Sequence, residues 1–280
     1  MKELLNIMQK KQKSKPINNN PIGIFDSGFG GLTVMSEICK VLPYENLIYF
    51  GDTAHVPYGS KSQNTVIKFS KEIASFLIKQ KVKLIVIACN TATAFALTVL
   101  QKKFKIPIVG VIKPGAKISI LASKNKKIGI IGTEGTINSK SYPKEINKLA
   151  KVKVYQQACP LFVPIVEEGF INCEFTYAIV QKYIQPLLNK KIDTIVLGCT
   201  HYPLLKNIIR KHLAGNITLI DSAQAISQEV KNILIEKNLL ANNDKPYFKF
   251  YVSDNPLKFK KIGYRFFGKE ITNIKKIDLE

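Results

Sequence analysis

One short pattern occurs twice in this chain, 110 residues apart, and it limits the folds that the chain can adopt. The first copy reads KLIVIACNTATA (83–94) and the second reads TIVLGCTHYPLL (194–205). Each copy has an apolar run, then a small residue, then a cysteine, which is Cys89 or Cys199. Hydroxyl and amide side chains follow, where a helix could begin. A buried strand that ends at a polar corner is typical of a parallel sheet with helices on both faces.

A second pair of segments repeats at a matching interval. PIGIFDSGFGGL (21–32) resembles part of KKIGIIGTEGTINS (126–139), and when Gly23 is aligned with Gly129, Asp26 falls on Gly132. Two such pairs indicate an internal repeat. We therefore predict an α/β fold of two similar, doubly wound lobes with parallel sheets, related by pseudo-twofold symmetry. Ligands of such sheets bind beyond the carboxyl ends of the strands, so the active site should lie in the cleft between the lobes.

The order of the segments assigns the chain to the two lobes. The first lobe should comprise residues 21–112 and 222–280, and the second lobe residues 113–221. The alternation in YFKFYVSD (247–254) predicts an edge strand that rejoins the first lobe. Residues 1–20 are polar and rich in lysine, and we expect a basic N-terminal tail whose removal costs little stability.

The charge balance is strongly basic but does not indicate a specific nucleic-acid site. Lysine and arginine number 42 against 20 aspartates and glutamates, which gives a formal charge of +22. Only Arg210 and Arg265 are arginines, although base recognition favours arginine. The lysines are spread along the chain. We therefore expect no more than non-specific binding of nucleic acid at low salt.

The sequence lacks signals for membranes, disulfides and cofactors. No apolar run reaches the roughly 18–20 residues of a membrane span, and the N-terminal residues carry no signal-peptide core, so we expect a cytoplasmic protein without membrane association. The five cysteines are odd in number and form no CxxC pair, which argues against disulfides and zinc. Cys39, Cys159 and Cys173 are expected to be structural. No phosphate loop or dinucleotide fingerprint occurs, and we expect no cofactor and no metal.

Two thiols that face each other across a small ligand suit a reaction that removes a proton on one side and delivers one on the other. A thiol has a reference pKa near 8.5, and a helix beginning after each cysteine should stabilise its thiolate. Small and polar residues at the same strand ends could hold a carboxylate by hydroxyl, amide and backbone N–H groups. They are Asp26, Ser27, Pro57, Tyr58, Gly59, Asn90, Thr91, Thr133, Thr136, Thr200 and His201. For Asp26 the alternative is a structural role as a helix N-cap.

Five motifs, in this order, resemble those of glutamate racemases in the aspartate/glutamate racemase superfamily. They are GIFDSGFGGLTV, YFGDTAHVPYGSKS, IACNTATA, ACPLFVPIVEEG and LGCTHYPLL, and the resemblance extends from residue 21 to about residue 268. It implies an isomerase without a cofactor, an amino-acid racemase that interconverts L- and D-glutamate for peptidoglycan synthesis in the cell wall. The expected partners are the substrate glutamate and a second copy of the chain in a homodimer.

The resemblance also implies roles for single residues. Cys199 would take the α-proton of L-glutamate and Cys89 that of D-glutamate, and each would reprotonate the carbanion that the other forms. Asp26 would assist Cys89, and His201 would assist Cys199. Glu167, in preference to the next glutamate, would line the same site, and the small and polar residues named above match the substrate-binding positions.

Two alternatives remain open at this point. The first is a racemase of the same superfamily that acts on aspartate or another amino acid, which a comparison of rates on the two substrates would decide. The second is an additional role in binding nucleic acid or a partner protein through the basic surface. A gel shift across a salt series would test that role.

Overall fold

The computed structural model describes residues 18–213 and 215–279. Its strands are β1 (Ile22–Asp26), β2 (Leu47–Gly51), β3 (Leu84–Ile87), β4 (Ile108–Gly110), β5 (Lys127–Gly132), β6 (Lys153–Ala158), β7 (Thr194–Gly198), β8 (Thr218–Asp221), β9 (Phe248–Val252) and β10 (Ile274–Lys276). Its α-helices are α2 (Leu32–Val41), α3 (Gln63–Lys79), α4 (Asn90–Lys103), α5 (Ile112–Ala122), α6 (Glu134–Asn138), α7 (Ser141–Leu149), α8 (Phe162–Glu168), α9 (Glu174–Leu188), α10 (Lys206–His212), α11 (Ser222–Glu236) and α12 (Pro256–Phe267). Two short 3-10 helices are η1 (Tyr58–Ser60) and η2 (Tyr202–Leu205).

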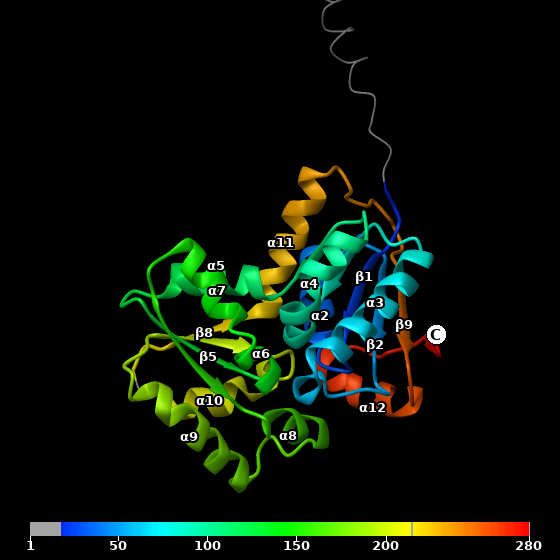
Figure 1. Cartoon of the computed structure of the whole chain (residues 1–280). Helices are drawn as coiled ribbons and strands as arrows, with labels where there is room; N and C mark the ends of the chain where they lie inside the picture. Colours follow the sequence, from blue (N-terminus) through cyan, green and yellow to red (C-terminus); the bar gives the residue numbers. More distant parts are fainter. Residues whose placement is uncertain (1–17, 214, 280) are drawn as a thin grey trace, which may run out of the picture.

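The strands form two sheets in which neighbouring strands run parallel. The first sheet has the order β10-β9-β2-β1-β3-β4, and the second has the order β6-β5-β7-β8. Figure 1 shows the second sheet with its green and yellow helices beside the first sheet, which combines blue and orange segments from both ends of the chain. The predicted α/β fold with two lobes is confirmed.

One sequence prediction about the first sheet is wrong. β9 is not an edge strand, because it pairs with β2 on one side and with β10 on the other. Phe250, for example, lies opposite both Tyr49 and Ile274. The edge is β10, whose three residues IKK contain no apolar run that could mark a strand. The alternation in β9 therefore could not reveal that another strand covers it.

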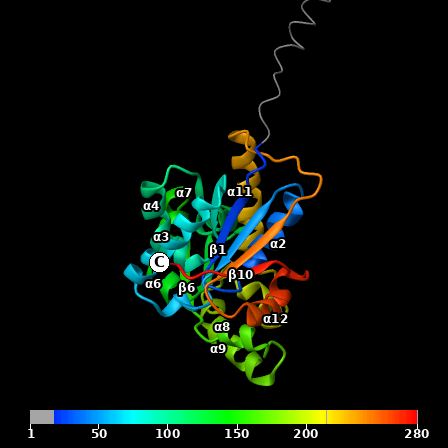
Figure 2. The same ribbon diagram turned by 90° about the vertical axis from the view of Figure 1, so that its right-hand side faces the viewer.

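Helices cover both faces of the first sheet (Figure 2). On one face α3 and α4 pack against it and contribute buried apolar side chains such as Ile73 and Leu100. On the other face lie α2, α11 and α12, with buried side chains such as Met35, Val230 and Phe259. Because helices cover both faces of the sheet, side chains that point to either face are buried, and the central strands are therefore largely apolar along their length.

The core of the second lobe is continuous with that of the first. α5 and α7 cover one face of the second sheet, and α8, α9 and α10 cover the other. The cluster of buried residues on that second face also contains residues of α2, α11 and α12. α11 contacts both α2 and α5, so one helix packs against helices of both lobes.

The polar segment before β1 belongs in part to the folded body. Lys83 Nζ donates to the backbone oxygen of Asn18 at 2.7 Å, and Asn46 Nδ2 donates to that of Asn19 at 2.8 Å. The predicted tail therefore ends earlier than residue 20. Residues 1–17, to which the remaining prediction of a dispensable tail applies, lie outside the described residues.

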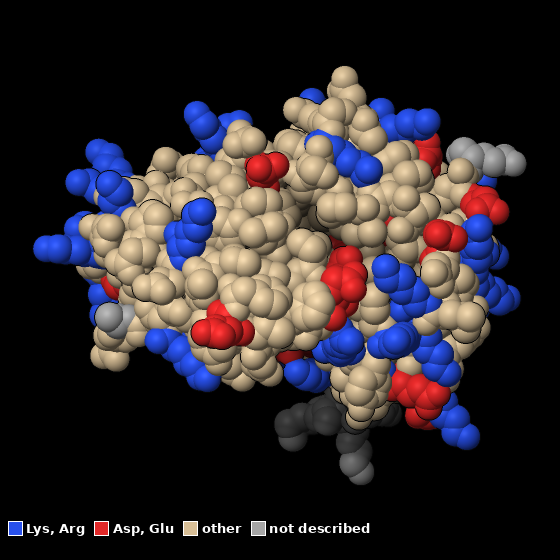
Figure 3. Space-filling view, turned by 90° about the horizontal axis from the view of Figure 1, so that it is seen from below, with Lys and Arg blue, Asp and Glu red and all other residues tan. Residues whose placement is uncertain are grey.

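Lysine side chains cover both lobes and are not gathered in one patch. On the face in Figure 3 they lie at many separate places, and acidic side chains occur among them. No helix within the described part of the chain is both long and apolar enough to cross a membrane.

Candidate active site

The repeated corners occupy equivalent places in the two sheets. Asp26 ends β1 and Gly132 ends β5. Each of these strands pairs with the strand that leads to a cysteine, β3 for Cys89 and β7 for Cys199. Both thiols therefore lie just beyond the carboxyl ends of central parallel strands, where the repeat placed them.

The chain after the two cysteines differs between the corners. Cys89 is the N-cap of α4, and its Sγ accepts from the backbone N–H of Ala92 at 3.4 Å. After Cys199 the chain makes a turn and the 3-10 helix η2, with Pro203 in its first turn, and an α-helix begins only at Lys206. The prediction of a helix directly after each cysteine thus holds at Cys89 and is wrong at Cys199.

Both cysteines line one cavity between the lobes. The other predicted residues that line it are Ser27, Pro57, Tyr58, Gly59, Asn90, Thr91, Thr133, Thr136, Thr200 and His201. Val56 and Val163, which the sequence did not indicate, complete the apolar part of the wall. The cavity has a volume of about 20 Å³, room for about one water molecule. A ligand the size of an amino acid fits only when the walls move apart.

Burial holds both thiols in their neutral form. It raises the pKa of Cys89 to about 12 and that of Cys199 well above its ordinary value. The negative charge of Asp26 adds to the shift at Cys89, and the backbone N–H of His201 opposes it at Cys199. The backbone N–H groups after each cysteine lower the pKa of its thiol, in the direction that the sequence indicated, but the loss of hydration on burial raises that pKa by more.

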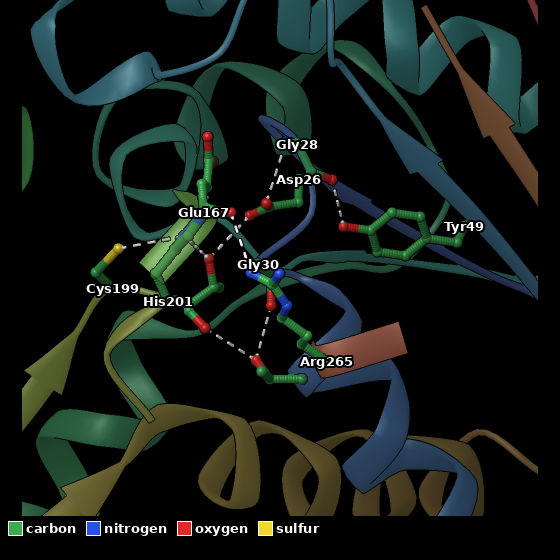
Figure 4. A network of polar contacts seen from close by, with 10 residues as sticks. Asp26, Gly28, Gly30, Tyr49, Glu167, Cys199, His201 and Arg265 are labelled. Atoms are coloured by element: carbon green, nitrogen blue, oxygen red, sulfur yellow. Dashed lines mark hydrogen bonds and ion pairs between the residues drawn. The ribbon is translucent and has the colours of Figure 1, made fainter. Parts of the chain in front are cut away.

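His201 links Cys199 to a carboxylate (Figure 4). Its Nδ1 lies 3.9 Å from Cys199 Sγ, and its Nε2 lies 2.9 Å from Glu167 Oε1. When Nε2 carries the ring proton and donates a hydrogen bond to the Glu167 carboxylate, Nδ1 presents a lone pair toward the thiol. An imidazole oriented in this way can take the proton of a neighbouring thiol. The neighbouring Glu168 is exposed, so Glu167 is the one of these two consecutive glutamates that contacts His201.

Two residues of helix α12, in the first lobe, contact His201 and its partner Glu167. The ring of Phe266 lies edge-on to His201 at a centroid distance of 5.1 Å. Arg265 donates to the backbone oxygen of Glu167 at 3.3 Å, near the end of α8 (Figure 4). The position of the imidazole thus depends on contacts from both lobes.

Asp26 is fully buried behind the cavity wall. Its Oδ2 accepts from the backbone N–H of Gly28 at 3.2 Å, and its Oδ1 accepts from Thr200 Oγ1 at 3.4 Å (Figure 4). Burial raises the pKa of this carboxyl group, and the imidazole of His201 partly opposes the shift. The N-cap of α2 is Gly31, so the alternative role of Asp26 as that cap is wrong.

Three threonine hydroxyls meet across the cavity. Thr91 Oγ1 of the first lobe lies 2.9 Å from Thr133 Oγ1 and 3.2 Å from Thr136 Oγ1 of the second lobe. The two hydroxyls of the second lobe are 3.1 Å apart. Such a group of exchangeable donors can turn toward a carboxylate, because a hydroxyl can rotate its proton to suit the acceptor.

Sequence reasoning missed Asp52, which is buried beside the site. Tyr58 lines the cavity with its ring, while its hydroxyl donates to Asp52 Oδ2 at 2.6 Å. Ser253 Oγ donates to the other oxygen of Asp52 at 2.7 Å. The available signal was position, because Asp52 directly follows the end of β2 as Ser27 follows the end of β1.

The close approach of the lobes at Gly59 gives a direct test of closure. A Cβ at Gly59 would lie 2.6 Å from Thr133 Cβ, nearer than two such carbons can pack. In Gly59→Ala the added methyl group should disfavour contact between the walls at Gly59 and Thr133, at the roughly 1–3 kcal/mol cost of overpacking. We therefore expect kcat/KM for the substrate of this cavity to fall by about tenfold or more. Turnover in the variant, compared with Ser60→Ala at the exposed neighbouring position, is the measurement. Normal turnover in Gly59→Ala would mean that these walls need not close.

Within residues 18–213 and 215–279, no group of three or more histidine, cysteine, aspartate or glutamate side chains is arranged to hold a metal ion.

The sequence of this chain is similar to those of a known protein family. The model of the Asp/Glu/Hydantoin racemase family matches residues 31–230. The glutamate racemase of Geobacter metallireducens is 47% identical over 261 residues, which are 92% of this chain and 97% of that protein. A glutamate racemase of Neisseria meningitidis serogroup A is 48% identical over 262 residues, with the same two coverages.

Solved structures give the same result for the fold. The structure of glutamate racemase isoform RacE1 from Bacillus anthracis superposes with a TM-score of 0.91 at 41% identity, over 94% of this chain and 98% of that one. The glutamate racemase of Francisella tularensis, solved in complex with D-glutamate, superposes with a TM-score of 0.88 at 40% identity and the same coverages. A match this extensive, in sequence and in the arrangement of both lobes, means that the chain belongs to the Asp/Glu/Hydantoin racemase family.

Proposed function

We propose that this protein is a glutamate racemase that interconverts L- and D-glutamate by proton transfer between two cysteines. The observation that carries the proposal is the placement of Cys89 and Cys199, one from each lobe, in the wall of one cavity. Relatives that align along more than nine-tenths of the chain bear this name, which supports glutamate as the substrate.

In the proposed reaction one cysteine acts as a thiolate and the other as a thiol. With L-glutamate, Cys199 takes the α-proton and the bonding electron pair stays on the α-carbon. Cys89 then gives its proton to the opposite face of that carbon, which inverts the configuration. The two cysteines end with exchanged protonation states, and the reverse reaction begins from this arrangement.

The first thiolate has to form in a site that disfavours it. The ammonium group of the substrate brings a positive charge into the cavity, and a nearby positive charge lowers the pKa of a thiol. We propose that His201, whose Nδ1 lies 3.9 Å from Cys199 Sγ, receives the proton of that thiol. The threonine hydroxyls Thr91, Thr133 and Thr136, with Ser27 and Asn90, are proposed to hold the carboxylates.

The remaining proposals concern the setting of the reaction. We propose that the lobes divide near residues 112 and 221, where the chain leaves one sheet for the other. We also propose that the protein works in the cytoplasm as a homodimer, supplies D-glutamate for peptidoglycan, and needs neither cofactor nor metal. Nucleic acid is proposed to bind only non-specifically, in line with lysines that are spread over the surface (Figure 3).

The decisive experiment is circular dichroism of L-glutamate incubated with the purified protein and no added cofactor. We expect the signal to decay to zero as the racemic mixture forms, and to do so after dialysis against a chelator. L-Aspartate in the same assay is expected to react far more slowly. A faster reaction with aspartate would assign the protein to the other substrate, and no reaction with either would refute the proposal.

The two corners should differ in single-step kinetics. His201 lies next to Cys199, so we expect His201→Asn to slow proton exchange from L-glutamate by about 10- to 100-fold and exchange from D-glutamate much less. Asp26→Asn should alter exchange from both enantiomers, with the larger change for D-glutamate, because Asp26 is the foremost charge that raises the pKa of Cys89, whereas other groups come before it at Cys199.

Incorporation of solvent deuterium into each enantiomer, before equilibrium is reached, measures these steps. Both asparagine variants keep a polar side chain, and a comparison of melting temperatures separates damage to the fold from damage to the chemistry. Equal slowing from both enantiomers in His201→Asn would show that the histidine serves the cavity as a whole.

A further inference from the structure

A buried hydrogen bond joins the two lobes beside the cavity. Tyr142, in α7 of the second lobe, is fully buried, and its hydroxyl donates to Asn90 Oδ1 at 2.9 Å. Asn90 is the first residue of α4 in the first lobe, directly after Cys89, and is 2% exposed. The bond therefore connects an element without a predicted role to the residue next to a reactive thiol.

The other half of the Asn90 amide has no partner. Asn90 Nδ2 is buried, and among the described residues no group accepts a hydrogen bond from it. Asn90 also lines the cavity. A buried donor without an acceptor costs free energy, and such donors in native proteins usually meet a ligand or an ordered water. This amide is thus fixed at its oxygen and unpaired at its nitrogen.

The Tyr142 phenol is a neutral hydrogen-bond donor in a closely packed position. Burial raises the pKa of the Tyr142 phenol far above its ordinary value, and the charge of Asp221 adds to that effect. The phenol therefore keeps its proton and can donate it. The ring is fully buried and packs closely against the backbone of two glycines, because a Cβ added at Gly198 would lie 3.2 Å from Tyr142 Cε2 and one added at Gly115 would lie 3.2 Å from its hydroxyl oxygen.

From these contacts we infer that Tyr142 is a positioning residue, which holds the Asn90 amide so that its Nδ2 donates to a carboxylate of the substrate. This inference rests on the proposed function. An amide that turned over would present its oxygen to the carboxylate, and two acceptors repel each other. Tyr142 stabilises the observed orientation by donating to the amide oxygen, so we infer that the second lobe helps to set the direction of a donor that belongs to the first.

The test is Tyr142→Phe, which keeps the ring and removes the donor. We expect KM for L-glutamate and for D-glutamate to rise by the same factor, about three- to tenfold, the size of one neutral hydrogen bond. kcat should stay within about twofold in both directions, because neither atom of the pair exchanges a proton with the substrate. The matched control is Tyr251→Phe, a buried tyrosine of the first sheet whose hydroxyl lies 3.4 Å from Gln80 Oε1.

A double-mutant cycle separates this role from general packing. In an Asn90→Ala background, Tyr142→Phe should cause no further rise in KM, because the amide that it orients is gone. Additive effects, an unchanged KM in Tyr142→Phe, or a loss of kcat in one direction only would overturn the inference.

Two further measurements keep the test decisive. Asn90→Asp retains an oxygen acceptor for Tyr142 but has no amide donor, so its KM should rise by about threefold or more. This measurement is available even if Tyr142→Phe cannot be purified. An unchanged KM in Asn90→Asp would also overturn the inference. Racemisation by the unaltered protein is measured first, so that failure of the proposed function is recognised separately from failure of this inference.

Discussion

Replacing either Cys89 or Cys199 by alanine is expected to lower kcat/KM for racemisation about a thousandfold or more while the fold remains intact. Each turnover needs one cysteine to accept a proton and the other to donate one, so neither can compensate for the other. Both side chains are small and line the cavity wall, so alanine leaves the packing of the sheets in place. Circular dichroism of glutamate measures the activity and a thermal melt measures the fold.

The serine variants add a more detailed expectation for the same pair. Serine at position 199 should abolish racemisation but leave slow exchange of the α-proton of D-glutamate at Cys89, because that half of the reaction still has its base. Cys173→Ala is the control, since this half-exposed cysteine lies outside the cavity. Near-normal racemisation in either alanine variant would rule out the two-cysteine scheme.

Glu45→Gln is expected to lower the free energy of unfolding by about 3–5 kcal/mol, seen as a fall in Tm of about 10 °C. Lys83 Nζ lies 2.6 Å from Glu45 Oε2, and the two side chains are only 1% and 2% exposed. Burial lowers the pKa of Lys83. Removal of the carboxylate leaves a buried ammonium without its counter-charge, which is far more costly than loss of an exposed pair.

The direction of the pH dependence follows from the lowered pKa of Lys83. A lysine whose pKa falls on folding costs stability while it is charged, and the cost disappears as the pH rises above its reference value of about 10.4. The gap between Glu45→Gln and the unaltered protein should therefore narrow at alkaline pH. Glu37→Gln, which breaks an exposed pair with Lys40, should change stability by about 1 kcal/mol or less. The double replacement Glu45→Leu and Lys83→Met should recover most of the loss, and a double variant as unstable as the single one would contradict this account.

Sequence reasoning located the site because the signal there is local. A buried apolar run followed by a polar corner identifies the carboxyl end of a strand, and two such runs identified Cys89 and Cys199. The neighbours of these corners, from Ser27 to Thr136, follow from the same rule. The resemblance to glutamate racemases added Glu167, whose contact with His201 no local pattern could indicate.

The features that escaped depend on contacts between distant segments. The three residues of β10 become a strand only because β9 offers them an edge. The thiol pKa values depend on burial by two lobes, which outweighs the helix N-terminus that the sequence made visible. Tyr142 contacts Asn90, 52 residues away, and its own neighbours in the sequence give no hint of that contact. The contact of Asp52 with Ser253 is equally distant from any local pattern, although the place of Asp52 after β2 was a usable signal.

The discontinuous first sheet has a consequence for the order in which the protein can be completed during synthesis. β2 is made early, but its partner β9 follows about 200 residues later, a delay of roughly 10–40 s at the usual rate of 5–20 residues per second. The second sheet uses a continuous stretch of chain, Lys127 to Asp221, and all of its strands are available before β9 emerges. The sheet that begins first is therefore finished last, and for that interval β2 presents an open edge to the chaperones and neighbouring chains around the ribosome.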